Sequence, residues 1–513
     1  MNDAPTNGST NGSTNRSTNN GILVVDVGTS GLRAAVVRPD GSIDALHHEA
    51  FVPSTPFAGL VEFDPAELAT RVLRVAHAAL AAAGPVDAVG IANQRASTIV
   101  WNRRTGRPTG PALGWQDLRT VGECMAAKVE HGLNLAPNQT ATKAGWMLRN
   151  HALDGIDPAD LVIGTVDSWV AWTLSGGERL HVSDHTNVAV TGLATVHEGT
   201  PRWNARAAAV CGVPLDALPN IVPSSGVVGV AAALPGSPPI AALAGDQQAS
   251  LIGQSCVRPG MAKATFGTGG MLDIVTGDTA PSRADRTPHG TFPIVAWSTI
   301  DRGESRLVWG SEAVMLAAGS NVEWLRDDLG LVASADETAR VASECASTDG
   351  VMFVPALLGL GTPSWDYGAR GALVGITRGT TRAHVVRAVL EGVAHRGADL
   401  LDAVTADHPD AEPNELRIDG GMSRNEVFVQ ALADATSKPV SVSPVTEATT
   451  LGAAYLAGLA VGTWSSLDDI AHLWRPLATV EPGPASSPES RARWADAVTR
   501  AAGWIPELSA LDF

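Results

Sequence analysis

Two short turns rich in glycine and hydroxyl residues are the first candidates for chemistry in this sequence. Gly28-Thr29-Ser30-Gly31 and Gly267-Thr268-Gly269-Gly270 each follow an apolar run. Backbone N–H groups and hydroxyls in such a turn can form a concave site for phosphate oxygens, and Arg33 could add a positive charge beside the first one. Each turn alone could equally be a plain hairpin loop, but the presence of two favours phosphate binding.

Two aspartates stand where apolar runs end. Asp26 follows Ile22–Val25 and could hold Mg²⁺, through water because this ion gives up its hydration shell reluctantly. It could also simply begin a turn. Asp246 follows the run 239–244 and precedes a helical segment. It could accept the proton of an attacking hydroxyl during phosphoryl transfer, or it could be a helix N-cap.

A third strand end, Asp419-Gly420-Gly421, also precedes a helical segment. Its glycines would let a ligand approach the backbone, and a helix start favours phosphate, although a lone Gly-Gly is a weak signal. The sequence contains no P-loop, no Rossmann fingerprint, no nucleophile elbow and no HExxH pair. Hydrolase and metalloprotease chemistry are therefore not indicated.

The elements that must position these residues follow an α/β pattern. Apolar runs around the first turn predict a β-hairpin that ends near Val37. Apolar residues at helical spacing predict a helix over 64–83, which Gly84-Pro85 ends, and a strand over 86–91 follows. Strands that alternate with helices indicate an α/β fold.

The second half of the chain repeats this order. A strand over 239–244 leads into a helix over 247–253, and a second hairpin spans 262–275. A chain of 513 residues with 44% hydrophobic residues is too long for one ordinary core. We therefore expect a tail at residues 1–20, a first domain at 21–255 and a second at 256–513.

Composition excludes several classes of protein. The net charge is −17 and no Lys/Arg block is present, so nucleic acid is not an expected partner. No run of eighteen apolar residues predicts a membrane span. The four cysteines form no CxxC pair, which favours reduced thiols in a cytoplasmic protein. The low-complexity start lacks the features of a signal peptide.

With these residues in place, the chain resembles the FGGY carbohydrate kinases, and most closely the glycerol kinases within that family. The resemblance runs from about Ile22 to about Pro476. Its most specific segments, in order along the chain, are 26–33, 93–95, 164–169, 183–187, 245–250, 265–270, 353–371 and 447–454. Each segment is moderately specific alone, and their order and spacing make chance a poor explanation.

The resemblance implies a two-lobed, duplicated ribonuclease-H-like α/β fold of the actin-like ATPase and sugar kinase type, with a cleft between the lobes. The first lobe would bind the polyhydroxylated substrate and the second the nucleotide, with ATP and Mg²⁺ as cofactors. Closure of the lobes would exclude water and favour transfer over ATP hydrolysis. Family members often form dimers or tetramers, so a homodimer or homotetramer is possible for this chain.

By the same resemblance, Asp246 is the general base and Asp26 lies at the magnesium. The substrate would contact Arg95, Asp246 and Gln247, and the altered positions Ala96 and Asn138 described below. The phosphates would contact the first turn at Thr29, Ser30, Gly31 and Arg33. The residues implied for the nucleotide are Thr268, Gly319, Glu323, Gly421 and Asn425.

The sequence departs from the glycerol kinase pattern around the substrate. The family's Glu after the substrate-binding Arg is Ala96, its substrate-contacting Tyr aligns with Asn138, and its pocket-closing aromatic is Met271. Its Gln near the adenine is Glu323. Losing hydrogen-bond partners weakens discrimination, and smaller side chains make room.

These departures lead to the hypothesis of a substrate larger than glycerol, although glycerol is the best single named candidate. The alternatives are a kinase for a larger ketose or cyclitol, and a catalytically silent sugar or nucleotide sensor on the same fold. A chaperone-like or actin-like ATPase is less consistent with the sequence, because no peptide-binding domain or helical lid follows the second lobe.

Overall fold

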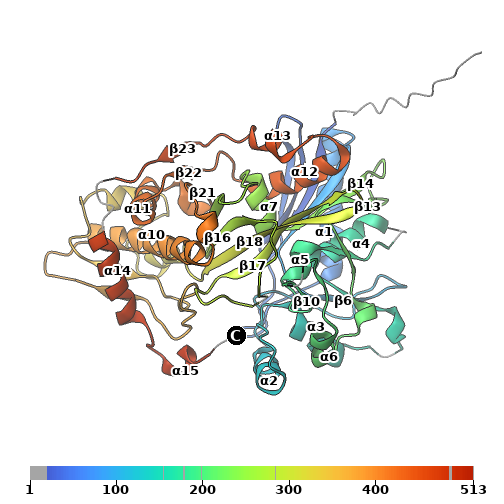
Figure 1. Cartoon of the computed structure of the whole chain (residues 1–513), viewed down its shortest axis with the longest axis horizontal. Helices are drawn as coiled ribbons and strands as arrows, with labels where there is room; N and C mark the ends of the chain where they lie inside the picture. Colours follow the sequence, from blue (N-terminus) through green and yellow to red (C-terminus); the bar gives the residue numbers. More distant parts are fainter. Residues whose placement is uncertain are drawn as a thin grey trace, which may run out of the picture.

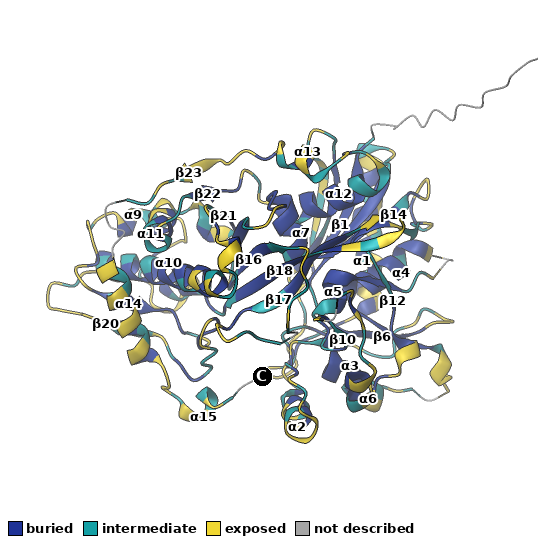
Figure 2. Cartoon of the chain, viewed as in Figure 1, coloured by how far each residue is buried: buried dark blue, intermediate teal, exposed yellow. Residues whose placement is uncertain are grey.

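The computed structural model describes residues 20–511, apart from 154, 177–178, 198, 284 and 484–487. The expected N-terminal tail lies outside the described residues except for Asn20. Two lobes lie side by side, each built on one mixed β-sheet (Figure 1). The strands of both sheets are mostly buried, whereas helices such as α2 and α14 expose their outer faces (Figure 2).

The sheet of the first lobe has the strand order β13-β14-β5-β1-β2-β3. Its central strand β1 pairs antiparallel with β2 and parallel with β5, and β5 pairs parallel with β14. The strands are β1 (Ile22–Val27), β2 (Gly31–Val37), β3 (Ile43–Ala50), β5 (Ala88–Asn93), β13 (Ser225–Val230) and β14 (Pro239–Gly245). The first predicted hairpin and the strand predicted over 86–91 are confirmed.

The sheet of the second lobe has the order β17-β18-β16-β15-β21-β22-β23. Strand β15 takes the place of β1, because it pairs antiparallel with β16 and parallel with β21. The strands are β15 (Ala262–Phe266), β16 (Gly270–Gly277), β17 (Phe292–Asp301), β18 (Glu304–Met315), β21 (Leu416–Asp419), β22 (Val440–Val442) and β23 (Ala478–Val480). The predicted internal duplication is therefore present in the fold.

Helices cover both faces of the first sheet. Leu23 and Val25 of β1 face a core shared with α1 (Pro65–Ala83) and α4 (Val166–Ser175), while the alternate β1 residues face a core shared with α7 (Asp246–Gly253) and α12 (Ala448–Val461). This period of two, with apolar residues on both faces, is typical of a strand buried between two layers. In the second lobe, α10 (Arg382–Asp407) and α11 (Glu426–Thr436) cover one face of the sheet.

Helices α7 and α12 cross between the lobes with almost no space between their backbones. A Cβ added at Gly253 would lie 1.8 Å from the carbonyl oxygen of Ala448, and one at Gly452 would lie 1.7 Å from that of Ala249. Only glycine permits this approach. Although α12 belongs to the second half of the chain, it packs against β5 and β14 of the first lobe. The domain boundary near residue 255 stays a prediction.

Smaller elements complete the chain. The remaining strands are β4 (Glu62–Phe63), β6 (Ile99–Asn102), β7 (Ala112–Leu113), β8 (Leu161–Gly164), β9 (Val182–Asp184), β10 (Ala194–Thr195), β11 (Arg202–Trp203), β12 (Asn220–Val222), β19 (Met352–Val354) and β20 (Ala372–Val374). The remaining α-helices are α2 (Val121–His131), α3 (Thr140–Asn150), α5 (His185–Ala189), α6 (Ala205–Cys211), α8 (Ser320–Glu323), α9 (Glu337–Ala342), α13 (Leu467–Ala471), α14 (Pro488–Ala501) and α15 (Pro506–Ser509). Among the described residues, no helix is both long and apolar enough to cross a membrane.

Candidate active site

Asp246 is the first residue of α7, directly after the parallel strand β14. The backbone N–H of Gly245 donates to Thr186 Oγ1 at 2.9 Å, and this hydroxyl donates to Asp184 Oδ1 at 2.9 Å. The strand-to-helix junction is thus held by a buried hydrogen-bonded chain. The junction places a carboxylate at the carboxyl end of a parallel strand, which is where open α/β sheets bind ligands.

The carboxylate of Asp246 is only partly engaged. Its Oδ1 accepts the N–H of Gln247 at 2.8 Å and lies 3.8 Å from Arg95 Nε. The N-cap position of α7 is occupied by Gly245, so the alternative in which Asp246 caps this helix is wrong. Burial raises the pKa of Asp246, while the charge of Arg95 opposes this shift. A raised pKa makes this carboxylate a stronger base, which suits a group that must accept a proton.

Arg95 extends from the end of β5 toward the second lobe. Its Nη2 donates to Glu312 Oε2 of β18 at 2.6 Å and lies 4.0 Å from Met271 Sδ of β16. Both partners of this ion pair are about 10% exposed. The remaining terminal nitrogen, Nη1, is buried without a hydrogen-bond partner. A buried donor of this kind calls for an acceptor, and a substrate hydroxyl would supply one.

Gln247 is also tied to the second lobe, because its Oε1 accepts a hydrogen bond from Lys263 Nζ of β15 at 2.6 Å. Four of the residues implied for the substrate pocket, Arg95, Asp246, Gln247 and Met271, are thus brought together at the boundary of the two sheets. Their chemical roles stay predictions.

The two altered positions lie on the same side of the first lobe. Ala96 is buried and has a φ of +62°, a left-handed conformation that is unusual for a residue with a Cβ. Its carbonyl oxygen accepts from Thr140 Oγ1 at 3.3 Å. Asn138 is exposed, and its carbonyl oxygen accepts from the buried Lys143 Nζ at 3.2 Å. Thr140 and Lys143 thus join α3 to both positions.

The first turn joins β1 to β2 and is tight, because the N–H of Gly28 donates to the carbonyl oxygen of Gly31 at 2.9 Å. Ser30 is exposed, and Thr29 Oγ1 accepts from Trp115 Nε1 at 3.1 Å. The exposed Ser30 leaves this side of the turn open to a ligand in the manner predicted for phosphate, while the Gly28 N–H is already used within the turn. Phosphate binding there stays a prediction.

Asp26 is buried at the end of β1, with Arg33 Nε at 3.5 Å. Arg33 also pairs with Glu447, which precedes α12. Burial raises the pKa of Asp26 to about 7, with Arg33 lowering it and the charge of Asp246 raising it further. The described residues contain no cluster of three or more metal-binding side chains. When nucleotide phosphates and water supply most of its ligands, Mg²⁺ needs only one or two carboxylates from the protein. A single buried carboxylate such as Asp26 therefore fits this ion.

The residues predicted to bind nucleotide gather in the second lobe. The carbonyl oxygen of Thr268 accepts from Ala318, and the N–H of Gly319 donates to the adjacent Gly267 at 2.8 Å. No atom lies within 4 Å of a Cβ placed on Gly421. These backbone segments converge beside β15 and β21, as an approach to phosphates or ribose requires.

Asn425 and Glu323 are less clearly placed. Asn425 caps α11 by accepting from the N–H groups of Val427 and Phe428, and it donates to Thr338 Oγ1 at 2.9 Å. Glu323 is exposed at the end of α8. A contact of either side chain with the nucleotide stays a prediction.

Sequence reasoning did not single out several residues that the structure places at this site. Glu312, Lys263 and Asp273 surround Arg95 and Gln247, and Trp115 contacts the first turn. A single charged residue in a mostly apolar run is the signal in the sequence for Lys263 and Asp273, whereas the segment of Glu312 contains other polar and charged residues and gives no such signal.

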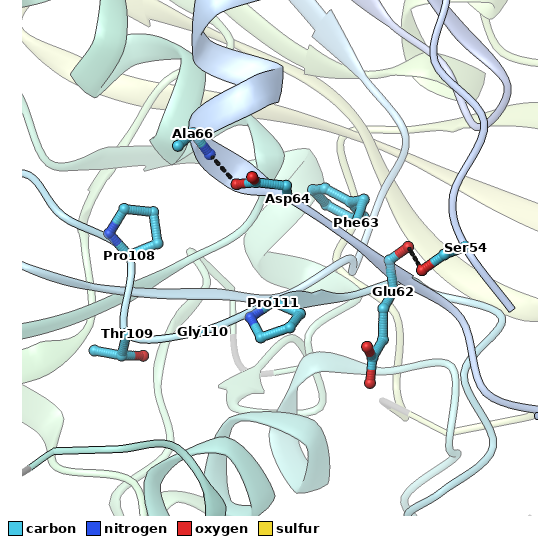
Figure 3. Close-up of a pocket in the computed structure, with 9 residues that line it drawn as sticks. All are labelled: Ser54, Glu62, Phe63, Asp64, Ala66, Pro108, Thr109, Gly110 and Pro111. Carbon is cyan, nitrogen blue, oxygen red and sulfur yellow. Dashed lines mark hydrogen bonds between the residues drawn. The ribbon is translucent and has the colours of Figure 1, made fainter. Parts of the chain in front are cut away.

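A separate cavity of about 490 Å³ lies on the first lobe (Figure 3). Its lining includes Phe63, Asp64 and Pro111, and Asp64 is used there to cap α1 through the N–H of Ala66 at 2.8 Å. None of the residues predicted for catalysis or binding lines this cavity.

Comparison with known proteins agrees with this geometry. Residues 21–253 match the model of the FGGY family of carbohydrate kinases, N-terminal domain, and residues 262–461 match that of its C-terminal domain. A glycerol kinase of Deinococcus radiodurans is 41% identical over 508 residues, which cover 95% of this chain and 99% of the relative. A glycerol kinase of Trichlorobacter lovleyi is 42% identical over 503 residues, covering 94% and 99%.

Among solved structures, the glycerol kinase of Plasmodium falciparum with ADP superposes with a TM-score of 0.86 at 28% identity, covering 94% of this chain and 98% of that one. The predicted two-domain fold is confirmed. Nothing in these similarities supports the alternative of a ketose or cyclitol kinase or of a silent sensor.

Proposed function

This chain belongs to the FGGY family of carbohydrate kinases, and we propose that it transfers the γ-phosphate of ATP to a hydroxyl of a small neutral polyol, with Asp246 as general base. The family and the glycerol kinase relatives identify it as an ATP-dependent phosphotransferase with an alcohol acceptor. The finer assignments below concern the substrate, the base and the metal.

The observation that carries the proposal is the environment of Asp246. One carboxylate oxygen is held by the N–H of Gln247, and the side chain keeps 28% of its surface exposed. A hydroxyl that approaches this exposed side can form a hydrogen bond with the other oxygen. Phosphoryl transfer needs positioning, charge neutralisation and one such base rather than covalent chemistry from the protein.

The surrounding charges favour a neutral substrate. Around Asp246, Arg95 is paired with Glu312 and Lys263 is paired with Asp273. Each of these two cations already has a carboxylate partner, so neither is left to neutralise an acidic substrate. Arg95 Nη1 and the amide nitrogen of Gln247 remain as donors for hydroxyl oxygens.

In this mechanism, Asp246 accepts the proton as the hydroxyl oxygen attacks the γ-phosphorus, the bond from that phosphorus to the bridging oxygen breaks, and ADP leaves. The turn at Thr29 and Ser30 would lie against the transferred group. Mg²⁺ held near Asp26 would neutralise phosphate charge. Arg33 is paired with Asp26 and Glu447 and lies on the same side of the site, where its guanidinium group could donate hydrogen bonds to phosphate oxygens.

A turnover screen tests the proposal. ADP release is measured with ATP, Mg²⁺ and glycerol, then with tetritols, pentitols, ketoses and cyclitols, and the phosphorylated product is identified by mass spectrometry. We expect polyol-dependent ADP release. Because the buried Ala96 is smaller than the Glu of the glycerol kinase pattern, we expect polyols longer than glycerol to be accepted as well. ADP release that does not depend on any added polyol would refute the proposed acceptor.

We further propose a cytoplasmic location and a homo-oligomeric state. The four cysteines are free thiols, which suits a reducing compartment. Val52, Phe57 and Val129 of the first lobe are each more than 70% exposed, as residues at a subunit interface would be in an isolated chain. Light scattering coupled to size-exclusion chromatography measures the oligomeric state.

A further inference from the structure

A buried ion pair stands behind the substrate-facing residues. Lys263 of β15 and Asp273 of β16 lie directly opposite each other in the antiparallel ladder, with Nζ and Oδ2 2.7 Å apart. Both side chains are fully buried. Their neighbours in the same strands, such as Ala264 and Leu272, point to the apolar core under α10 and α11. The charged pair therefore lies on the opposite face of the sheet, which faces α7.

The ammonium group of Lys263 has three partners. Besides Asp273, it donates to Gln247 Oε1 at 2.6 Å and to Thr265 Oγ1 at 3.2 Å. The contact with Asp273 is an ion pair without a hydrogen bond, since neither Asp273 carboxylate oxygen has a hydrogen-bond partner in the described part of the chain. Gln247 belongs to the first turn of α7 and is adjacent to Asp246. A cation of the second lobe thus holds a side chain of the first.

This contact fixes which end of the Gln247 amide faces the site. Because Oε1 accepts from an ammonium group, the amide nitrogen is the end that remains free, and it can only donate. A polyol hydroxyl can accept from that nitrogen. If the amide were not anchored, it could rotate and lose this orientation.

We propose that Lys263 is a positioning residue for substrate binding, which acts by orienting the Gln247 amide, and that Asp273 keeps Lys263 in place. The inference rests on the proposed function, since it assigns Gln247 to the bound polyol. A purely structural role accounts for the pair less well. Burying two charges costs more than burying apolar side chains of similar size, and these two are the only charged residues of β15 and β16.

The test compares the wild type with Lys263→Met/Asp273→Leu, which removes both charges together and leaves neither one buried alone. We expect the KM for the polyol to rise about two- to tenfold, the range that one lost hydrogen bond between neutral groups accounts for. The KM for ATP should stay within about twofold, and the melting temperature should change little.

Gln247→Leu closes a mutant cycle. If Lys263 acts through Gln247, adding Gln247→Leu to the double variant causes no further rise in the KM for the polyol. Additive effects, or equal rises in both KM values, would overturn the inference. Should the double variant fail to fold, Asp273→Asn is measured instead; a several-fold rise in the polyol KM alone is expected, and an unchanged KM would count against the inference.

A structural readout separates this inference from the proposed function. A crystal structure of the double variant should show the Gln247 amide rotated or in two orientations. An amide that keeps the wild-type position without Lys263 would overturn the positioning role, whatever the enzyme phosphorylates. Conversely, a wild type that turns over no polyol would refute the proposed function. The position of the Gln247 amide in the crystal structure of the double variant would still decide whether Lys263 orients it.

Discussion

The ion pair between Arg95 and Glu312 joins the two lobes beside the proposed base, and Glu312→Gln removes its negative charge without changing its shape. Both side chains are about 10% exposed, and their N–O distance is 2.6 Å. Removing one partner of a buried pair costs about 3–5 kcal/mol. Glutamine can still accept a hydrogen bond from Arg95, and Asp246 lies 3.8 Å away, so we expect a smaller loss of about 1–3 kcal/mol.

This loss has two measurable consequences. At about 2–4 °C per kcal/mol for folding units of this size, the melting temperature should fall by roughly 2–12 °C. Arg95 would then turn to Asp246 as its nearest remaining carboxylate. A closer cation lowers the pKa of Asp246 and weakens it as a base, so kcat/KM should fall about tenfold and its acidic limb should shift to lower pH.

Differential scanning calorimetry and a pH profile of kcat/KM measure these effects. Glu304→Gln is the matched control, because Glu304 lies on the same strand β18 but is exposed, and its melting temperature and kinetics should equal those of the wild type. A Glu312→Gln variant with wild-type stability and activity would refute the reasoning, since it would mean that the pair does not hold the lobes together in solution.

Three further predictions concern the base, the metal and a partly buried histidine. Asp246→Asn should lower kcat by about 10²–10⁴-fold while equilibrium dialysis still detects polyol binding; an active variant would exclude this base. Asp26→Asn should raise the Mg²⁺ concentration needed for half-maximal turnover, and chelation of Mg²⁺ should abolish wild-type turnover; an unchanged Mg²⁺ dependence would remove Asp26 from the metal site. Burial lowers the pKa of His181 to about 4, against about 6.5 in an unfolded chain. The unfolded chain therefore binds more protons, and stability should fall as the pH drops from about 6.5 to 4. In urea titrations at several pH values, His181→Gln should make the free energy of unfolding depend less on pH. Replacement of the exposed His77 should leave this dependence unchanged. The same pH dependence in both variants would contradict the assignment to His181.

Much of the fold could be predicted from the sequence, because its signals are local. The helix predicted over 64–83 begins at Pro65 and ends at Ala83, with Asp64 as its cap and Gly84 as its stop. Both hairpins follow from apolar runs that flank short turns. The duplication could be inferred because the same run-and-turn order occurs twice.

The site was predicted less completely, because it is assembled from residues that are distant in the sequence. Asp246 and Arg95 could be named by resemblance, but no local pattern pairs Arg95 with Glu312, which is 217 residues away. Likewise, the sequence shows Lys263 and Asp273 only as charged residues in apolar segments. Their pairing depends on the register of β15 and β16, which places the two residues opposite each other. The alternative of Asp246 as the N-cap was wrong by one residue, because the N-cap is Gly245. Helix boundaries are commonly uncertain by one or two residues.

The crossing of α7 and α12 also limits how this gene can be recombined. Helix α12 is encoded in the second half of the gene but covers strands β5 and β14 of the first lobe. A hybrid that joins halves of two homologues near residue 255 would set a foreign α12 against Gly253, where any bulk beyond glycine meets the backbone of Ala448. Chimeras that fold should therefore be those in which residues 448–461 come from the same parent as the first lobe. Substitutions at Gly253 and Gly452 should be rare in homologues that keep this helix packing.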